Sequence, residues 1–418
     1  MTPADALDRI RRLNPQLHAY AQVFEPPLGA GEGPLVAVKD LIDIAGRPTS
    51  GGARTPLAET AGANAVVVDR LLEAGCRIVG KTHTVELAYG GYGTNRAVGA
   101  PRNPWRLEPH HAPGGSSSGS AVAVAAGLCD AALGTDTGGS VRIPAALCGI
   151  VGLKPGRGLV SRRGVHPLSP SLDTVGALAR DVAGAARLLE AMASGAEDAP
   201  RGPFDAGAAL ATDVRGLMVA AVPAERLPGL HPEVARLYGE ALERLGGAGV
   251  EVRFVEPEPS WETYFEPTTT LMAGEGWRCW AERIGRHEAE MDPWVARRLR
   301  AGASISDDQL AAALARREGD QAEADRWLAG YAALLMPTCP IPAPALEAVD
   351  ETVSSLSSLT RGANYLDLPA ASVPCGLTDE GMPVGLQIVG GRGDETGVVA
   401  LAAAFERVSG WEGRSPPL

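Results

Sequence analysis

Lysine is scarce in this 418-residue chain, because only three of its 38 basic residues, Lys39, Lys81 and Lys154, are lysine and the others are arginine. Arginine stays protonated near neutral pH, whereas a buried lysine can lose its proton. A chain that uses arginine almost everywhere is expected to keep lysine where arginine cannot serve. The scarcity therefore marks the three lysines as candidate proton acceptors.

Several other patterns are also missing. The six cysteines form no C-x-x-C pair and no metal-ligand spacing, so we expect buried thiols in a reducing compartment and neither a metal nor another cofactor. The net charge of −12 argues against a surface for nucleic acid. No apolar run is long enough to span a bilayer and the N-terminal stretch lacks the apolar segment of a signal peptide, so we expect no membrane partner and a cytoplasmic location.

Two loops rich in glycine and serine lie between Pro113 and Pro155. The first reads GGSSSGS over residues 114–120, the second reads GTDTGGS over residues 134–140, and a small apolar run joins them. A flexible linker is rich in glycine and serine over its whole length, but each of these loops borders valine, alanine or leucine. We therefore expect both loops to be buried turns inside a folded core.

Glycine next to serine lets several backbone N–H groups approach a negatively charged oxygen. That oxygen can belong to a phosphate or to the oxyanion of an acyl-transfer reaction. Phosphate binding requires either G-x-x-x-x-G-K-[ST] or G-x-G-x-x-G followed by an acid, and neither pattern is present. A purely structural turn is the third interpretation, and the pattern favours acyl transfer over both alternatives.

The motifs resemble the amidase signature family, serine hydrolases that use a triad of serine, a serine in a cis peptide bond and lysine. The resemblance is carried by GGSSSGS, by GTDTGGSVRIPAALCGIVGLKP from residue 134 and by VAVKDLID from residue 36. Looser similarity at residues 336–338 and 364–385 extends it over nearly the whole chain. It implies an α/β fold in which a large mixed β-sheet is covered by helices on both faces.

The resemblance also implies a role for each member of the triad. Ser140 is the nucleophile, Ser116 is the bridging serine and Lys39 is the base, which must be neutral to accept a proton. Lys81 is an alternative base, but the resemblance makes it structural. The oxyanion would be bound by four backbone N–H groups, those of Thr137, Gly138, Gly139 and Ser140.

Four neighbouring side chains admit two roles each. Arg142 would either bind a substrate carboxylate or form a structural ion pair, and the ion pair is favoured because this arginine is a usual feature of the family. Ser117 would take part in the hydrogen bonds of the triad or only in those of its loop. Asp136 and Asp173 would orient the loops.

Hydrophobic periodicity places helices and strands along the chain. It predicts helices over residues 4–14, 65–74, 183–192, 231–246 and 310–335, and strands over residues 35–38, 76–79, 217–222, 250–255 and 383–389. We expect one domain over residues 1–418, with a variable substrate-pocket region around residues 200–330.

The expected function is hydrolysis of an amide-type C–N bond, in an amide, urea or carbamate, through an acyl-enzyme on Ser140. The alternative is the glutamine-hydrolysing subunit of an amidotransferase, which uses the same triad and passes ammonia to a partner. Because the chain ends at Leu418 without an appended domain, we expect a stand-alone enzyme. Its substrate would be a small molecule, neither nucleic acid nor membrane would be a partner, and a homodimer is one assembly that the chain could form.

Overall fold

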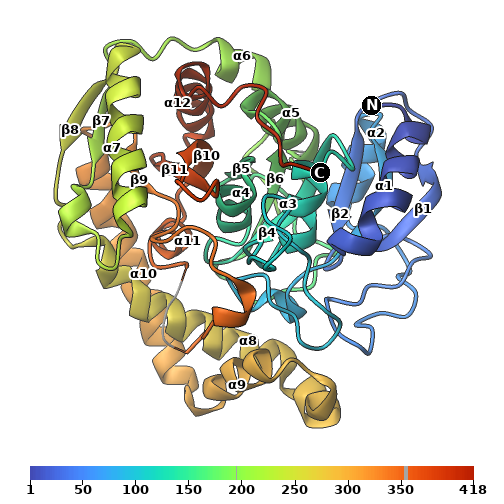
Figure 1. Ribbon diagram of the computed structural model, residues 1–418. Helices are drawn as coiled ribbons and strands as arrows, with labels where there is room; N and C mark the ends of the chain where they lie inside the picture. Colours follow the sequence, from blue (N-terminus) through green and yellow to red (C-terminus); the bar gives the residue numbers. More distant parts are fainter. Residues whose placement is uncertain (194, 353–355) are drawn as a thin grey trace.

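The structure is a computed structural model that describes residues 1–193, 195–352 and 356–418. Figure 1 shows a sheet that runs through the molecule with helices packed around it. The strands of this 11-stranded sheet are β1 (Tyr20–Leu28), β2 (Leu35–Lys39), β3 (Arg77–Thr82), β4 (Ala131–Asp136), β5 (Val151–Lys154), β6 (Thr174–Ala179), β7 (Met218–Ala221), β8 (Glu251–Phe254), β9 (Leu334–Pro337), β10 (Ala370–Leu377) and β11 (Pro383–Val389).

The helices alternate with these strands along the chain. Within the described residues the α-helices are α1 (Pro3–Leu17), α2 (Val66–Glu73), α3 (Ser118–Ala125), α4 (Arg142–Cys148), α5 (Val182–Met192), α6 (Ala206–Ala211), α7 (Pro232–Gly247), α8 (Phe265–His287), α9 (Pro293–Ala301), α10 (Asp307–Leu328), α11 (Arg361–Tyr365) and α12 (Glu395–Val408). None of the helices in these ranges combines the length and the apolar character needed to cross a membrane.

The sheet is mixed. Its strand order is β1-β3-β2-β4-β6-β5-β10-β11-β9-β7-β8. β2 runs parallel to β3 and β4, and β7 runs parallel to β8 and β9, whereas the other neighbouring strands are antiparallel. This architecture confirms the predicted α/β fold with a large mixed sheet.

Alternation along the strands supplies a core on each face, because successive strand residues point to opposite sides. In β2, Val36 and Val38 join a core with α2, α5, α7 and α12, whereas Ala37 joins a second core with α1 and α3. In β9, Leu335 faces the first core, and its neighbours Leu334 and Met336 face a third core built with α8, α10 and α11. Helices therefore cover both faces, as predicted.

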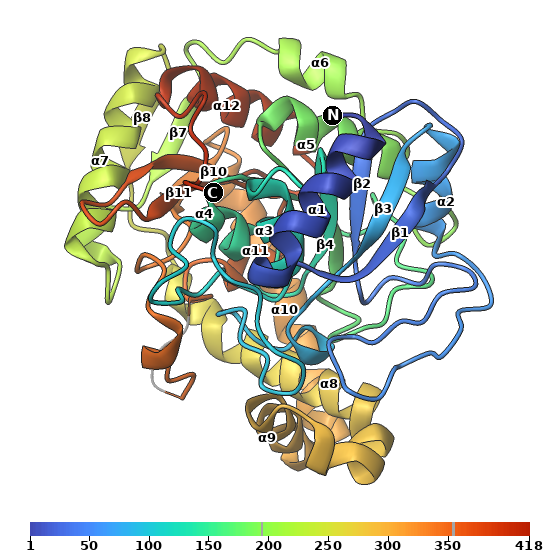
Figure 2. The same cartoon turned by 45° about the vertical axis from the view of Figure 1, so that its right-hand side comes forward.

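The third core holds a group of helices at one end of the molecule. Figure 1 and Figure 2 both show α8 and α9 at the opposite end from α6 and α12. The prediction of a helix over residues 310–335 is wrong at its end, because α10 stops at Leu328 and Leu334 already lies in β9. Periodicity cannot distinguish a short apolar strand from the last turn of a buried helix.

Candidate active site

Lys39 is the last residue of β2, and its side chain is fully buried. Because β2 and β4 are parallel neighbours, their carboxyl ends lie at the same edge of the sheet. Lys39 Nζ therefore reaches the second glycine-rich loop, where it donates to Thr135 Oγ1 at 2.7 Å, and it donates to Ser116 Oγ at 2.8 Å. Burial lowers the pKa of Lys39 to about 7, although the negative charges of Asp136 and Asp173 act to raise it.

Ser116 and Ser140 belong to the two loops that the sequence singled out. The peptide bond from Gly115 to Ser116 is cis, and the Ser116 side chain is fully buried. The Ser117 N–H donates to the Ser140 carbonyl oxygen at 3.2 Å, which joins the first loop to the second. The Ser140 side chain is 7% exposed, and its hydroxyl forms no hydrogen bond with another described residue. Ser140 Oγ therefore has no hydrogen-bond partner among the described residues, and Ser140 lines a cavity.

The predicted oxyanion donors differ in their availability. Gly139 donates its N–H to Asp136 Oδ1 at 2.7 Å, so this N–H is already committed to the protein. The N–H groups of Thr137, Gly138 and Ser140 make no hydrogen bond with any described residue. Three of the four predicted donors are therefore uncommitted, and two of these residues, Gly138 and Ser140, line the cavity, whereas Gly139 holds the loop in shape.

Arg142 donates all five of its side-chain N–H groups in hydrogen bonds to other residues of the protein. It donates to both carboxylate oxygens of Asp136 at 2.9 and 3.1 Å, and to Asn364 Oδ1, Gln387 Oε1 and the Thr360 carbonyl oxygen at 2.6, 2.6 and 3.0 Å. Burial alone would raise the pKa of Asp136, but the Arg142 guanidinium holds it well below its usual range. No donor of Arg142 remains for a substrate, so the geometry favours the structural ion pair of its two predicted roles.

Asp173 and Ser117 also orient backbone around the site. Asp173 accepts from Thr137 Oγ1 at 2.6 Å and from the Leu168 N–H at 2.9 Å, and burial raises the pKa of Asp173 to about 6. The Ser117 hydroxyl donates to the Thr135 carbonyl oxygen and accepts from the Thr135 N–H, each at 3.2 Å. Asp173 thus holds the loop after β4 through Thr137, and Ser117 holds the end of β4 itself.

The other two lysines lie in different surroundings. Lys81 Nζ contacts Asp40 Oδ1 at 2.6 Å and donates to Thr49 Oγ1 at 2.8 Å. Burial lowers the pKa of Lys81, while the Asp40 charge acts to raise it. Lys154 donates to the Pro155 carbonyl oxygen at 2.7 Å, and burial lowers its pKa to about 8. Neither lysine contacts the two serines, so Lys39 alone of the three occupies the position of a base.

Ser140 opens into a cavity of about 660 Å³. Tyr89 and Tyr92 form part of its wall, and α8 contributes Phe265, Thr269 and Met272. The tryptophans of residues 200–330, where the sequence predicted the substrate pocket, do not line this cavity. Trp261, for example, is 5% exposed and packs edge-on against Tyr264 in the core.

Three charged residues in the cavity wall were missed by the sequence reasoning: Arg298, Glu351 and Arg361. They come from α9, from the segment before α11 and from the start of α11, which are far apart in the sequence. Arginine is the common cation of this chain, so no compositional signal distinguishes these two arginines. Only the folded chain brings them to Ser140.

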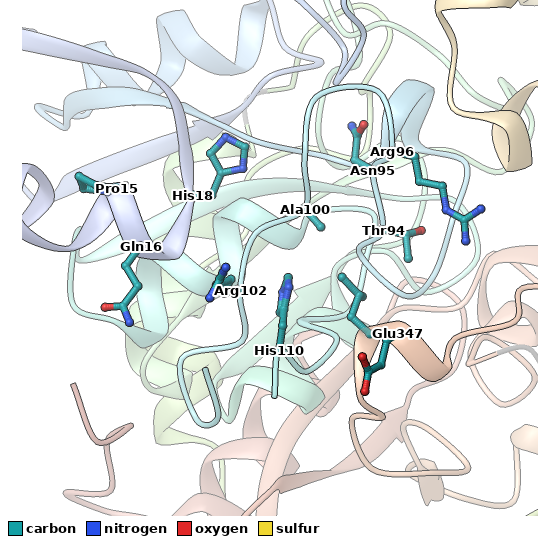
Figure 3. Close-up of a pocket in the computed structure, with 11 residues that line it drawn as sticks. Pro15, Gln16, His18, Thr94, Asn95, Arg96, Ala100, Arg102, His110 and Glu347 are labelled. Atoms are coloured by element: carbon teal, nitrogen blue, oxygen red, sulfur yellow. The ribbon is translucent and has the colours of Figure 1, made fainter. Parts of the chain in front are cut away.

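A second cavity of about 660 Å³ lies elsewhere in the structure. Figure 3 shows His18, Arg102 and His110 around it, with Asn95 and Glu347 also in its wall. Burial lowers the pKa of both histidines. None of the predicted site residues lines this cavity, so the one that contains Ser140 is the candidate active site.

Comparisons with known proteins match nearly the whole chain. A family model described as Amidase matches residues 4–399. The A subunit of the glutamyl-tRNA(Gln) amidotransferase of Symbiobacterium thermophilum is 37% identical, and the alignment covers 97% of this chain and 88% of that protein. The protein of the same name from Methanosarcina mazei is 36% identical, with 92% and 87% covered.

Solved structures also match nearly the whole chain. A crystal structure described as an amidase is 34% identical, with a TM-score of 0.85, and the match covers 97% of this chain and 95% of that one. The A subunit of the glutamyl-tRNA(Gln) amidotransferase of Thermotoga maritima is 31% identical, with a TM-score of 0.84, and 97% and 90% are covered.

The relatives correct one expectation from the sequence. We expected a stand-alone enzyme that acts on a small molecule, and the expectation that the chain acts without protein partners is wrong. Three of the four proteins named above are each one subunit of an amidotransferase of glutamyl-tRNA(Gln), so their names point to protein partners. The absence of an appended domain carries no information on this point, because a subunit meets its partners as separate chains.

Proposed function

The chain belongs to the amidase signature family, enzymes that hydrolyse C–N bonds, and from this premise we propose that it releases ammonia from the side-chain amide of glutamine as one subunit of an amidotransferase. The observation that carries the proposal is the contact of 2.8 Å between Lys39 Nζ and Ser116 Oγ, next to a cavity that holds the Ser140 hydroxyl. A pKa of about 7 gives Lys39 a large neutral fraction at neutral pH.

The proposed reaction starts with attack by Ser140 Oγ on the amide carbon. Serine is a weak nucleophile until a base takes its proton. Ser140 passes that proton to Ser116 Oγ as Ser116 passes its own to Lys39 Nζ. The carbonyl oxygen gains a negative charge and accepts hydrogen bonds from the N–H groups of Thr137, Gly138 and Ser140.

The C–N bond then breaks. The proton returns from Lys39 through Ser116 to the departing nitrogen, which leaves as ammonia, and the acyl group remains as an ester on Ser140. Water attacks this ester by the same proton path in a second step. Glutamate is released and the Ser140 hydroxyl is restored, so all atoms and protons balance.

An acyl-enzyme trap tests this chemistry. The purified chain is incubated with glutamine and hydroxylamine, and we expect γ-glutamyl hydroxamate to form in place of glutamate. Mass spectrometry should locate a transient glutamyl group on Ser140, and the Ser140→Ala variant should form neither product. Hydroxamate formation by Ser140→Ala at the rate of the unchanged chain would refute the nucleophile assignment.

The assembly requires a second experiment. Ammonia release from glutamine is measured for the chain alone and after addition of companion amidotransferase subunits from the same organism. We expect the companions to bind and to raise the rate, because ammonia from a subunit of this kind is used by its partner. Unchanged turnover and no complex in size-exclusion chromatography would contradict the proposed assembly.

A further inference from the structure

The cavity next to Ser140 contains one positive charge that no described carboxylate balances. Its charged wall residues are Arg298, Glu351 and Arg361. Arg298 forms an ion pair with Glu351, whose side chain is 2% exposed, and also donates to the Tyr89 carbonyl oxygen at 2.6 Å. The residues outside the described ranges, at 194 and 353–355, are serine and valine and carry no charge. The charge of Arg361 is therefore left over.

Arg361 is held in place by neutral groups. Its Nε donates to Ser357 Oγ at 2.7 Å and its Nη1 donates to Thr269 Oγ1 at 2.6 Å. Its Cζ lies 4.2 Å from the centre of the Phe265 ring. These contacts orient the guanidinium without neutralising it, and Nη2 has no acceptor among the described residues.

Arg361 also lies close to the reacting groups. A Cβ atom built on Gly138 would lie 3.3 Å from Arg361 Cγ, so the arginine packs against the loop that carries the oxyanion donors. Gly138 is two residues before Ser140. Ser140 and Arg361 line the same cavity, so a substrate whose carbonyl carbon lies at Ser140 has Arg361 in the same cavity as a partner for its acyl part.

A partly buried arginine without a counter-ion is unfavourable, because burial removes water from its charge. Burial lowers the pKa of Arg361 to about 10, and the nearby positive charge of Arg298 acts in the same direction. An anion in the cavity would relieve both effects. The planar fork of a guanidinium matches a carboxylate, which can accept two parallel N–H bonds.

We propose that Arg361 binds a carboxylate on the acyl part of the substrate, so that the site selects monoamides of dicarboxylic acids. This inference rests on the proposed function and deepens it, since glutamine is one member of the class. Glu351 is the one acidic residue in the described wall of the cavity, and Arg298 already occupies it. The site thus offers no uncommitted carboxylate to the α-ammonium group of glutamine, and glutaramate, which lacks that group, should be hydrolysed as well as glutamine.

Three amides of nearly equal size separate the possibilities: glutamine, glutaramate and the uncharged glutaramide. Ammonia release gives kcat/KM for each. For the unchanged chain we expect glutaramate to exceed glutaramide by about 10- to 100-fold, the range for a hydrogen bond to a charged group. Equal values for glutaramate and glutaramide would overturn the role of Arg361 while leaving amide hydrolysis intact. No hydrolysis of any of the three would instead refute the proposed function.

Variants locate the effect. Arg361→Met removes the charge at similar length, and we expect KM for glutaramate to rise by about 10- to 100-fold while glutaramide changes little. Arg361→Lys should restore part of the preference. Arg297→Met is the matched control, because Arg297 is an exposed arginine of α9 outside the cavity wall, and it should preserve the preference. A preference that survives in Arg361→Met would refute the inference.

Binding gives a readout that does not require turnover. Glutarate, the product of glutaramate hydrolysis, is titrated by calorimetry into the full chain. We expect Arg361→Met to weaken glutarate binding by about 10- to 100-fold and Arg297→Met to leave it unchanged. Equal affinities in the unchanged chain and Arg361→Met would overturn the proposal even if neither turned over an amide.

Discussion

The surroundings of Lys39 and of Lys81 place the same residue type, fully buried, in opposite chemical situations. Lys39 ends β2 and Lys81 lies in β3, the strand beside it. Lys81 has the carboxylate of Asp40 at 2.6 Å, whereas Lys39 contacts only the hydroxyls of Ser116 and Thr135 among the described residues. A buried lysine with a carboxylate in contact keeps its proton, and one without it can give the proton up.

The carboxylate that distinguishes the two lysines is that of Asp40, which is next to Lys39 in the chain but contacts Lys81. Asp40 follows Lys39 directly in the chain, but consecutive residues of an extended segment point to opposite sides. In the β2–β3 register Val38 lies opposite Lys81, and Asp40 points to that same side. The alternation thus gives Asp40 to Lys81 and leaves Lys39 without a counter-ion in contact.

The largest expected effect comes from making the same substitution at both lysines. Lys39→Arg should lower kcat for glutamine hydrolysis by about 100- to 10,000-fold, because an arginine cannot accept the proton at neutral pH. Lys81→Arg should retain most of the activity, since an arginine can still pair with Asp40. Initial rates of ammonia release from folded protein decide between them. An active Lys39→Arg variant would remove the proton relay from the mechanism.

The second effect is on stability, and it reverses the ranking of the two sites. Lys81→Met leaves Asp40 buried without its partner and should lower the free energy of unfolding by about 3–5 kcal/mol. Lys39→Met should cost no stability, because the folded pKa of about 7 lies below that of an unfolded lysine. At pH 8 the folded lysine is largely neutral, so folding displaces a proton and the substitution removes that penalty.

Urea unfolding at pH 8 measures both values. The double variant Lys81→Met/Asp40→Leu is the control, since it removes the stranded carboxylate and should recover most of the loss. A loss at Lys39→Met equal to that at Lys81→Met would mean that Lys39 is charged in the folded protein. The two lysines would then not differ as proposed.

The sequence predicts the local features of the site, but it does not predict the contacts between distant segments. The rarity of lysine marked three candidate bases and the glycine-serine loops marked the region of the site, and the resemblance to the amidase signature family selected Lys39, Ser116 and Ser140 among them, because all these signals lie within short stretches of chain. The strand over residues 35–38 is present as β2 and the helix over residues 65–74 as α2. Local periodicity carries such information directly.

Contacts between distant segments could not be predicted in this way. The pairing of Asp40 with Lys81 depends on the register of two strands, and the position of Arg361 beside Gly138 depends on how α11 packs against the loop after β4. In both cases the two residues lie far apart in the sequence, and only the folded chain brings them together.

The smallest expected effect concerns Thr135, whose hydroxyl accepts a hydrogen bond from Lys39 Nζ alongside that of Ser116. With a pKa of about 7 and the neutral form active, kcat/KM should rise about tenfold per pH unit below pH 7 and level off above it. Thr135 Oγ1 accepts from Lys39 Nζ, and an acceptor favours the charged lysine over the neutral one. Thr135→Val removes this acceptor and should therefore move the rising limb to lower pH. Thr135→Ser keeps the hydroxyl and should leave the limb in place, and pH profiles of ammonia release compare the two. A limb that moves to higher pH in Thr135→Val would show that Thr135 stabilises the neutral lysine instead, and the low pKa of Lys39 would then owe less to burial alone.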